Sequence, residues 1–121
     1  MARTVLVAED GKTTRHVLSF ILANRGYEVI EVSDGKQAVK QAQERLPDLA
    51  ILDAELPERS GYHVYVMLKG DPATCHIPVL LLVADTPSFS MPTRTVPPAE
   101  CVMSKPFSAH DLLQRVGKLL T

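Results

Sequence analysis

The stretch Leu49-Ala-Ile-Leu-Asp53 consists of four apolar residues closed by an aspartate, and it decides the fold class. Two other short apolar runs end in the same way: Thr4-Val-Leu-Val-Ala-Glu-Asp10 ends on two acids, and Cys101-Val-Met-Ser-Lys105 ends on a lysine. Runs of this length and composition are typical of buried strands. In a parallel sheet the carboxyl ends of the strands share one edge, where ligand sites form. We therefore expect three acids and one lysine to converge there.

The segments between these runs alternate between helical and extended patterns. Helical spacing of apolar residues or capping side chains predict helices over Lys12–Arg25, Ser33–Leu46, Gly61–Lys69 and Ser108–Leu120. Further strands are predicted over Tyr27–Val32 and Val79–Val83. Strands that alternate with helices indicate a parallel sheet covered on both faces. The prediction is a three-layer α/β domain with a doubly wound, five-stranded, flavodoxin-like sheet.

The segment Asp85–Ala99 breaks this alternation. A helix is expected there, yet the segment contains Pro87, Pro92, Pro97 and Pro98. An interior proline destabilises a helix by about 3 kcal/mol. We therefore expect the fourth helix to be degraded or replaced by a loop.

The composition fits one globular domain over residues 1–121. The chain has 121 residues, of which 45% are hydrophobic and 22% are charged. The net charge of -1 gives no reason to expect direct binding to nucleic acid. No run approaches the roughly 18 apolar residues of a membrane span, and a strand prediction at Thr4 leaves no room for a signal peptide. Cys75 and Cys101 have no metal-site spacing, so we expect thiols in a reducing cytoplasm.

The acidic edge has a specific chemistry. Adjacent strands lie about 4.8 Å apart, so Asp10 and Asp53 would repel each other unless a cation lies between them. Hard oxygen ligands of this kind suit Mg²⁺, which typically takes one or two carboxylates, a phosphate and several waters. Asp53 is the candidate nucleophile because a carboxylate can form an acyl phosphate. Lys105 would neutralise phosphoryl oxygens.

With these residues in place, the chain resembles the receiver domains of two-component response regulators over essentially its whole length. The motifs that carry the resemblance are Glu9-Asp10, Pro47-Asp48 before Asp53, Pro57 and Gly61 after it, Pro78-Val79, and Lys105-Pro106-Phe107. The resemblance implies phosphorylation by a histidine kinase or a phosphotransfer protein, with catalysis by the receiver itself and Mg²⁺ as cofactor.

The resemblance also implies roles for individual residues. Asp53 would be the phosphoacceptor, and Asp10 and Asp53 would ligate Mg²⁺ together with the backbone carbonyl of Glu55. Glu9 would act on the metal through water. Lys105 would stabilise the phosphoryl group, and a cis Lys105–Pro106 bond would direct it into the site.

Two positions depart from the family pattern, and both concern switching. The family places Thr or Ser at the end of the fourth strand, where this chain has Val83, and usually an aromatic residue where it has Val102. Valine donates no hydrogen bond, so coupling between phosphorylation and output would weaken.

These departures leave two interpretations: a phosphoacceptor that signals through another surface, or a pseudo-receiver that binds an unknown partner regardless of phosphorylation. A third hypothesis, an aspartate-nucleophile phosphatase, is disfavoured because Glu55 stands where such enzymes carry a second aspartate.

Overall fold

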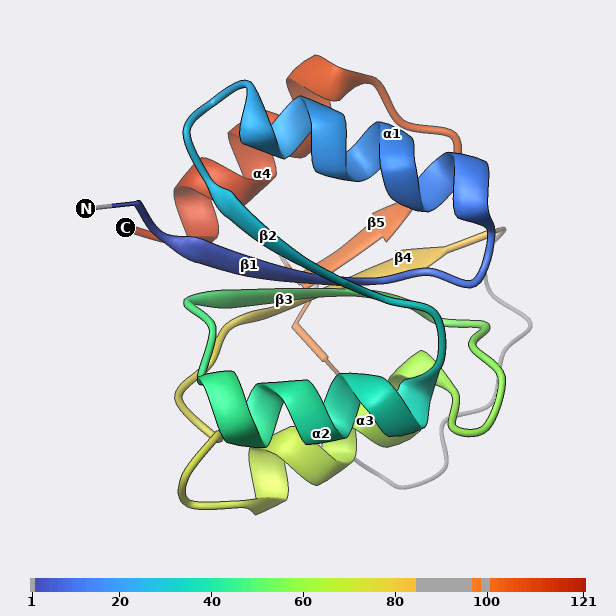
Figure 1. Ribbon diagram of the computed structural model, residues 1–121, viewed down its shortest axis with the longest axis vertical. Coiled ribbons are helices and arrows are strands. Elements are labelled where there is room, and N and C mark those ends of the chain that lie inside the picture. Colours follow the sequence, from blue (N-terminus) through green and yellow to red (C-terminus); the bar gives the residue numbers. More distant parts are fainter. Residues whose placement is uncertain (1, 85–96, 99–100) are drawn as a thin grey trace.

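The computed structural model describes residues 2–84, 97–98 and 101–121 (Figure 1). In chain order the elements are β1 (Thr4–Ala8), α1 (Lys12–Ala23), β2 (Glu28–Val32), α2 (Gly35–Arg45), β3 (Leu49–Asp53), α3 (Gly61–Gly70), β4 (Val79–Val83), β5 (Val102–Ser104) and α4 (Ala109–Leu119). The predicted alternation of strands and helices is confirmed, and so is the flavodoxin-like α/β class.

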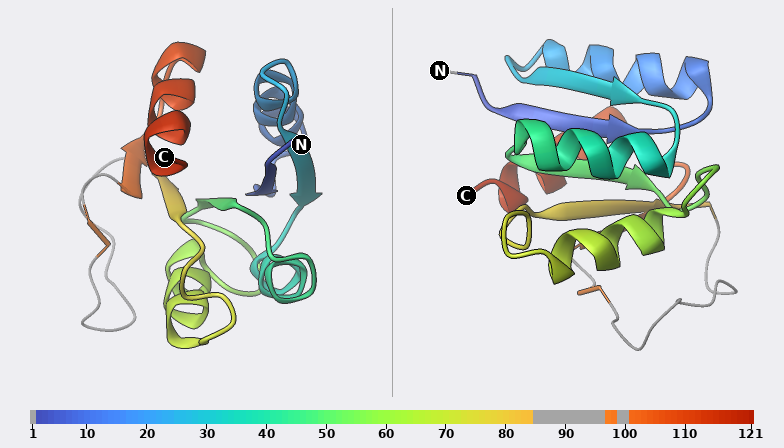
Figure 2. Two further views of the ribbon diagram at one scale, coloured as in Figure 1. Left: turned by 90° about the vertical axis from the view of Figure 1, so that its left-hand side faces the viewer. Right: turned by 60° about the horizontal axis from the view of Figure 1, so that its bottom comes forward.

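The five strands form one parallel sheet in the order β2-β1-β3-β4-β5. Helices α1 and α4 lie on one face of the sheet, and α2 and α3 lie on the other (Figures 1 and 2). The chain therefore leaves β1 toward one edge and β3 toward the other. The reversal falls between β1 and β3, and doubly wound folds bind ligands at the carboxyl ends of the strands beside such a reversal.

The central strands are buried on both faces. Every residue of β3 and β4 is buried, as their continuous apolar sequences predict. Successive side chains of β4 alternate between two clusters: Leu81 packs on the side of α2 and α3, and Leu80 and Leu82 pack on the side of α1 and α4. The central strands are thus held between two apolar layers.

Side-chain caps fix the starts of three helices. The carboxylate of Asp34 accepts a hydrogen bond from Gln37 N at 2.7 Å, and the hydroxyls of Ser60 and Ser108 accept from the third residue after each of them. Some element bounds differ slightly from the prediction. Helix α1 ends at Ala23 rather than Arg25, because the chain then turns through Gly26 at φ +90°. Strand β2 begins at Glu28, and β5 begins at Val102.

The predicted loop over Asp85–Ala99 lies outside the described residues, apart from the pair 97–98. Pro97 is buried, and the carbonyl of Pro98 accepts a hydrogen bond from Cys101 N at 2.9 Å. Among the described residues, no helix has the length and hydropathy that a membrane crossing requires.

Two glycines fix the loop that follows β3. The amide of Gly61 donates to the carbonyl of Ala54 at 2.9 Å, and the amide of Gly35 donates to the carbonyl of Pro57 at 3.0 Å. A Cβ atom on Gly61 would overlap the carbonyl oxygen of Asp53, and one on Gly35 would overlap the carbonyl of Arg59. The loop therefore passes so close to both helix starts that only glycine fits at these positions.

We expect Gly61→Ala to destabilise the domain by about 1–3 kcal/mol, the usual cost of overpacking, because the new methyl group meets rigid backbone. Gly117→Ala is the matched control. A Cβ atom at Gly117 meets nothing within 4 Å, so alanine should stabilise α4 by about 0.5–1 kcal/mol. Urea unfolding of both variants measures the difference. Equal effects of the two substitutions would contradict the close approach at Gly61.

Candidate functional site

Glu9 and Asp53 lie side by side at the carboxyl ends of β1 and β3. The register pairs Ala8 with Leu52, so the next residue on each strand is one of these acids. Both residues are buried, with 4% of Glu9 and 5% of Asp53 exposed. Two neighbouring carboxylates that are removed from water need a compensating cation.

Lys105 supplies that cation from the end of β5. Its Nζ lies 2.5 Å from Asp53 Oδ2 and 3.2 Å from Glu9 Oε1. The backbone amide of Lys105 donates to the carbonyl of Val83 at 2.8 Å, which ties the residue to the end of β4. The Lys105–Pro106 peptide bond is cis, as the resemblance to receiver domains implies. Lys105 thus joins two acids that are 44 residues apart in the chain.

Backbone amides hold the remaining oxygen of each buried carboxylate. Asp53 Oδ1 accepts a hydrogen bond from Glu55 N at 2.8 Å, and Glu9 Oε2 accepts one from Gly11 N at 3.0 Å. Each carboxylate is therefore oriented by an amide two residues further along its own loop and by the shared ammonium group. This arrangement fixes the direction in which both acids face.

The site shifts the pKa values of two of its groups. Burial is the main cause that raises the pKa of Glu9, and the neighbouring Asp53 raises it further, against the opposing effects of Gly11 N and Lys105. Burial by itself lowers the pKa of Lys105, but its hydrogen bonds and charge interactions with Asp53 and Glu9 outweigh burial, so the net pKa is raised. Lys105 therefore remains charged throughout the neutral range.

The other predicted metal ligands surround this pair. Asp10 is exposed just beyond Glu9, and the Glu55 side chain is exposed while its backbone lies against Asp53. Within the part of the chain that the structure describes, no three His, Cys, Asp or Glu side chains are grouped closely enough to hold a metal alone. The donor set nevertheless fits Mg²⁺, which needs only one or two carboxylates and completes its shell with water and phosphate.

Val83 and Val102 occupy the end of β4 and the start of β5. Val83 is 3% exposed, and the partly buried Val102 packs against the same apolar cluster. Val83 pairs in register with Ser104, one residue before Lys105. Val83 thus adjoins Lys105, and neither valine offers the site a polar side-chain atom.

Two residues that the sequence analysis did not single out also contact the site. Arg15 Nη1 donates to the backbone carbonyl of Glu9 at 2.8 Å, and Gly11 N binds the Glu9 carboxylate. Arginines on helices usually face solvent, and a backbone amide leaves no trace in a sequence. The signal in the sequence that could have pointed to this contact was the position of Arg15, five residues after Asp10 and near the start of a predicted helix.

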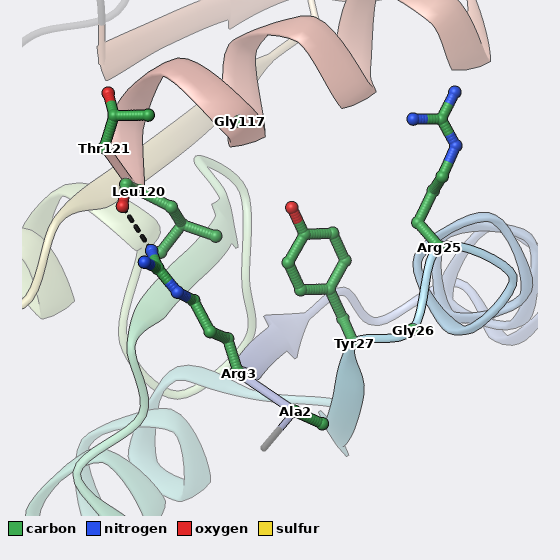
Figure 3. Close-up of a pocket in the computed structure, with 8 residues that line it drawn as sticks. All are labelled: Ala2, Arg3, Arg25, Gly26, Tyr27, Gly117, Leu120 and Thr121. Carbon is green, nitrogen blue, oxygen red and sulfur yellow. Dashed lines mark hydrogen bonds between the residues drawn. The ribbon is translucent and has the colours of Figure 1, made fainter.

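A separate pocket of about 370 Å³ lies at the amino end of the sheet, away from the acids. It is lined by Ala2, Arg3, Arg25, Gly26, Tyr27, Gly117, Leu120 and Thr121 (Figure 3). Arg3 donates a hydrogen bond to the carbonyl of Leu120, which is drawn in that view. Because β1 starts here and Glu9 follows its other end, this pocket is not part of the acidic site.

We expect Glu9→Gln to become more stable relative to the natural protein as the pH rises. The folded protein holds the Glu9 proton above the ordinary pKa of 4.5, so ionisation of Glu9 costs stability as pH rises through that range. The cost is absent at lower pH, and the amide of the variant does not ionise. Urea unfolding at about pH 4 and pH 7 measures the change. Glu44→Gln, at an exposed position of α2, is the control. A stability difference between Glu9→Gln and the natural protein that is the same at both pH values would contradict the expectation.

Comparison with known proteins places this geometry in a family. The family model of the response regulator receiver domain matches residues 5–117. The phosphate regulon transcriptional regulatory protein PhoB of Klebsiella pneumoniae is 35% identical over 120 residues, which are 99% of this chain and 52% of PhoB. The chain thus spans about half the length of that relative.

Solved structures agree with this fold. The structure of a response regulator from Chloroflexus aurantiacus has a TM-score of 0.85 at 28% identity and covers 99% of this chain and 98% of its own. The receiver domain of sensor histidine kinase PA1611 from Pseudomonas aeruginosa, with a magnesium ion in its active site cleft, has the same TM-score and coverage at 23% identity. From the match over residues 5–117, the chain belongs to the family of response regulator receiver domains.

Proposed function

We propose that this domain accepts a phosphoryl group on Asp53 from a phosphohistidine of a histidine kinase or a phosphotransfer protein, with Mg²⁺, and signals through protein–protein contacts. The observation that carries the proposal is the 2.5 Å contact of Lys105 Nζ with the buried Asp53 carboxylate at the carboxyl end of β3. The two cysteines are thiols, which suits the cytoplasmic location that we propose.

The transfer uses groups that the site already orients. A carboxylate oxygen of Asp53 attacks phosphorus, the phosphorus–nitrogen bond of the donor breaks, and the electron pair stays on the imidazole. The product is an acyl phosphate. Lys105, which now pairs with the carboxylate, would shift to an oxygen of the phosphoryl group and neutralise charge there.

Mg²⁺ would be held by Asp10, Asp53 and the Glu55 carbonyl, with Glu9 acting through water. When bound, Mg²⁺ stabilises charge on the phosphoryl oxygens. Glu9 and Asp53 share the one ammonium group of Lys105, and Asp10 follows Glu9 in the chain, so the acids at this edge outnumber that cation and favour a divalent ion. The magnesium ion of the PA1611 receiver supports the same choice of cofactor.

A second candidate function is that of a pseudo-receiver, which would bind its partner independently of phosphorylation. The favouring observation is that Val83, at the end of β4, is 3% exposed within an apolar cluster and donates no hydrogen bond to the site.

Of the two candidates, we propose that phosphorylation occurs but that its usual route to β4 and β5 is disconnected. Output would then pass through the loop between β3 and α3 or through the edge near Asp10.

Asp53→Ala is expected to abolish phosphoryl uptake while the domain remains folded, because alanine offers no oxygen to phosphorus. Incubation with acetyl phosphate and Mg²⁺, followed by intact mass measurement, tests this. Glu58→Gln, an exposed change in the same loop, is the control and should take up phosphate normally. A stable acyl phosphate on Asp53→Ala would place the acceptor elsewhere. No uptake by the natural protein would favour the pseudo-receiver.

Val83→Thr is expected to restore the coupling between a phosphoryl group at the acidic site and the end of β4, because threonine supplies a hydroxyl donor there. With beryllofluoride as a phosphoryl mimic, amide NMR shifts in the natural protein should stay at the acidic edge, and those of the variant should extend to Val102. A buried hydroxyl without a partner costs about 1–3 kcal/mol, so the variant should be less stable without the mimic.

Val79→Thr at the other end of β4 is the matched control, since Val79 is equally buried but lies away from the acids. Its shifts should remain local. Shifts in the natural protein that already extend to Val102 would show a working switch despite the valines.

A further inference from the structure

Arg15 links three segments around the acidic site. Its guanidinium Nη1 donates to the carbonyl of Glu9 at 2.8 Å, and its Nε lies 3.4 Å from Glu31 Oε1. The Arg15 side chain is half-buried, at 16% exposed, while the Glu31 side chain is more open to solvent, at 35%. One side chain on α1 thus binds the end of β1 and a residue of β2.

The carbonyl that Arg15 binds belongs to the peptide unit between Glu9 and Asp10. The amide of Glu9 on the other side of the residue donates to Val32 at 3.1 Å, so the sheet holds it. Because a peptide unit is planar, the bond from Arg15 fixes the orientation of the whole Glu9–Asp10 unit. That orientation determines the direction in which the Asp10 side chain leaves the backbone.

The same bond acts on the loop that carries the Glu9 carboxylate. Gly11 N, two residues after Glu9, donates to Glu9 Oε2 at 3.0 Å, and Lys105 Nζ contacts Glu9 Oε1 at 3.2 Å. Gly11 can reach the carboxylate only if the intervening peptide units keep their orientation. Without Arg15 the Glu9 carbonyl would lose its charged donor, and the Glu9 carboxylate could turn away from Asp53.

We propose that Arg15 is a positioning residue for the phosphorylation site: it holds the Glu9–Asp10 peptide so that both carboxylates face Asp53 and the metal. This inference rests on the proposed function, because it assigns Arg15 to the same Mg²⁺-dependent reaction. Arg15 touches neither the phosphoryl group nor the nucleophile, and it acts through the backbone of the two acids. Charged donors of this kind, one step behind the ligands, are what usually set ligand orientation at metal sites.

The test compares Arg15→Met with Arg25→Met, an exposed arginine just beyond the end of α1, as the matched control. The first readout needs no metal: hydrogen exchange of the Gly11 amide should be faster in Arg15→Met and unchanged in the control. The second is the dissociation constant for Mg²⁺, followed by amide NMR shifts, which should rise about 10-fold in Arg15→Met. Arg15→Lys should recover part of both effects, because an ammonium group keeps the charge but lacks the planar fork.

A purely structural role for Arg15 would give a different pattern. Arg15→Met would then melt at a lower temperature, while Gly11 exchange and Mg²⁺ affinity stayed within about twofold of the natural protein, and the proposal would be overturned. If Arg15→Met does not fold, Arg15→Lys decides by the same readouts: values equal to those of the natural protein overturn the proposal. Failure of the proposed function is distinct, because the natural protein itself would then bind no Mg²⁺ and take up no phosphoryl group.

Discussion

The contact of Lys105 with two buried carboxylates is the interaction on which the site depends. Glu9 and Asp53 are forced together because β1 and β3 are neighbours in the sheet and their register places the two acids side by side. Burial alone would drive such a pair apart or keep one acid protonated. The ammonium group of Lys105 offsets part of this repulsion, while burial first and Asp53 second raise the pKa of Glu9. The remaining negative charge is what would attract the Mg²⁺ ion of the proposed function.

Backbone contacts also hold the loops that carry Glu9 and Asp53. Gly61 and Gly35 let the loop after Asp53 approach two helix starts, and the amide of Glu55 reaches back to the Asp53 carboxylate. On the other side, the Glu9–Asp10 peptide is bound by Arg15. A site whose acids are oriented before any ligand arrives needs little reorganisation when charge develops on the phosphoryl group.

Chemistry and readout are separated in this chain. The acids and the lysine of the family pattern are present, and the structure brings Glu9, Asp53 and Lys105 into contact. At the end of β4 the pattern changes, because Val83 contributes its carbonyl to Lys105 N but no side-chain donor. Tyr62 and Tyr65 of α3 are buried in the same cluster as Val83, so this side of the sheet is closed by apolar packing. In the function that we propose, the phosphorylation site is therefore retained while the response of β4 and β5 weakens.

The sequence by itself determined the fold class, the five strands and the acids at their ends. It could do so because a strand buried on both faces must be continuously apolar, as in Val79–Val83, and because polar residues can resume only at the strand ends. The helix starts at Asp34 and Ser108 were equally readable, since capping is a local interaction.

Only the tertiary structure decided which groups meet. The role of Arg15 depends on how α1 packs across β1 and β2, and the contacts of Gly11 and Glu55 are made by backbone amides that every sequence contains. The need for glycine at positions 35 and 61 arises because distant backbone segments pass within contact distance. These are long-range, geometric facts, and a one-dimensional pattern records residue types but not the distances between them.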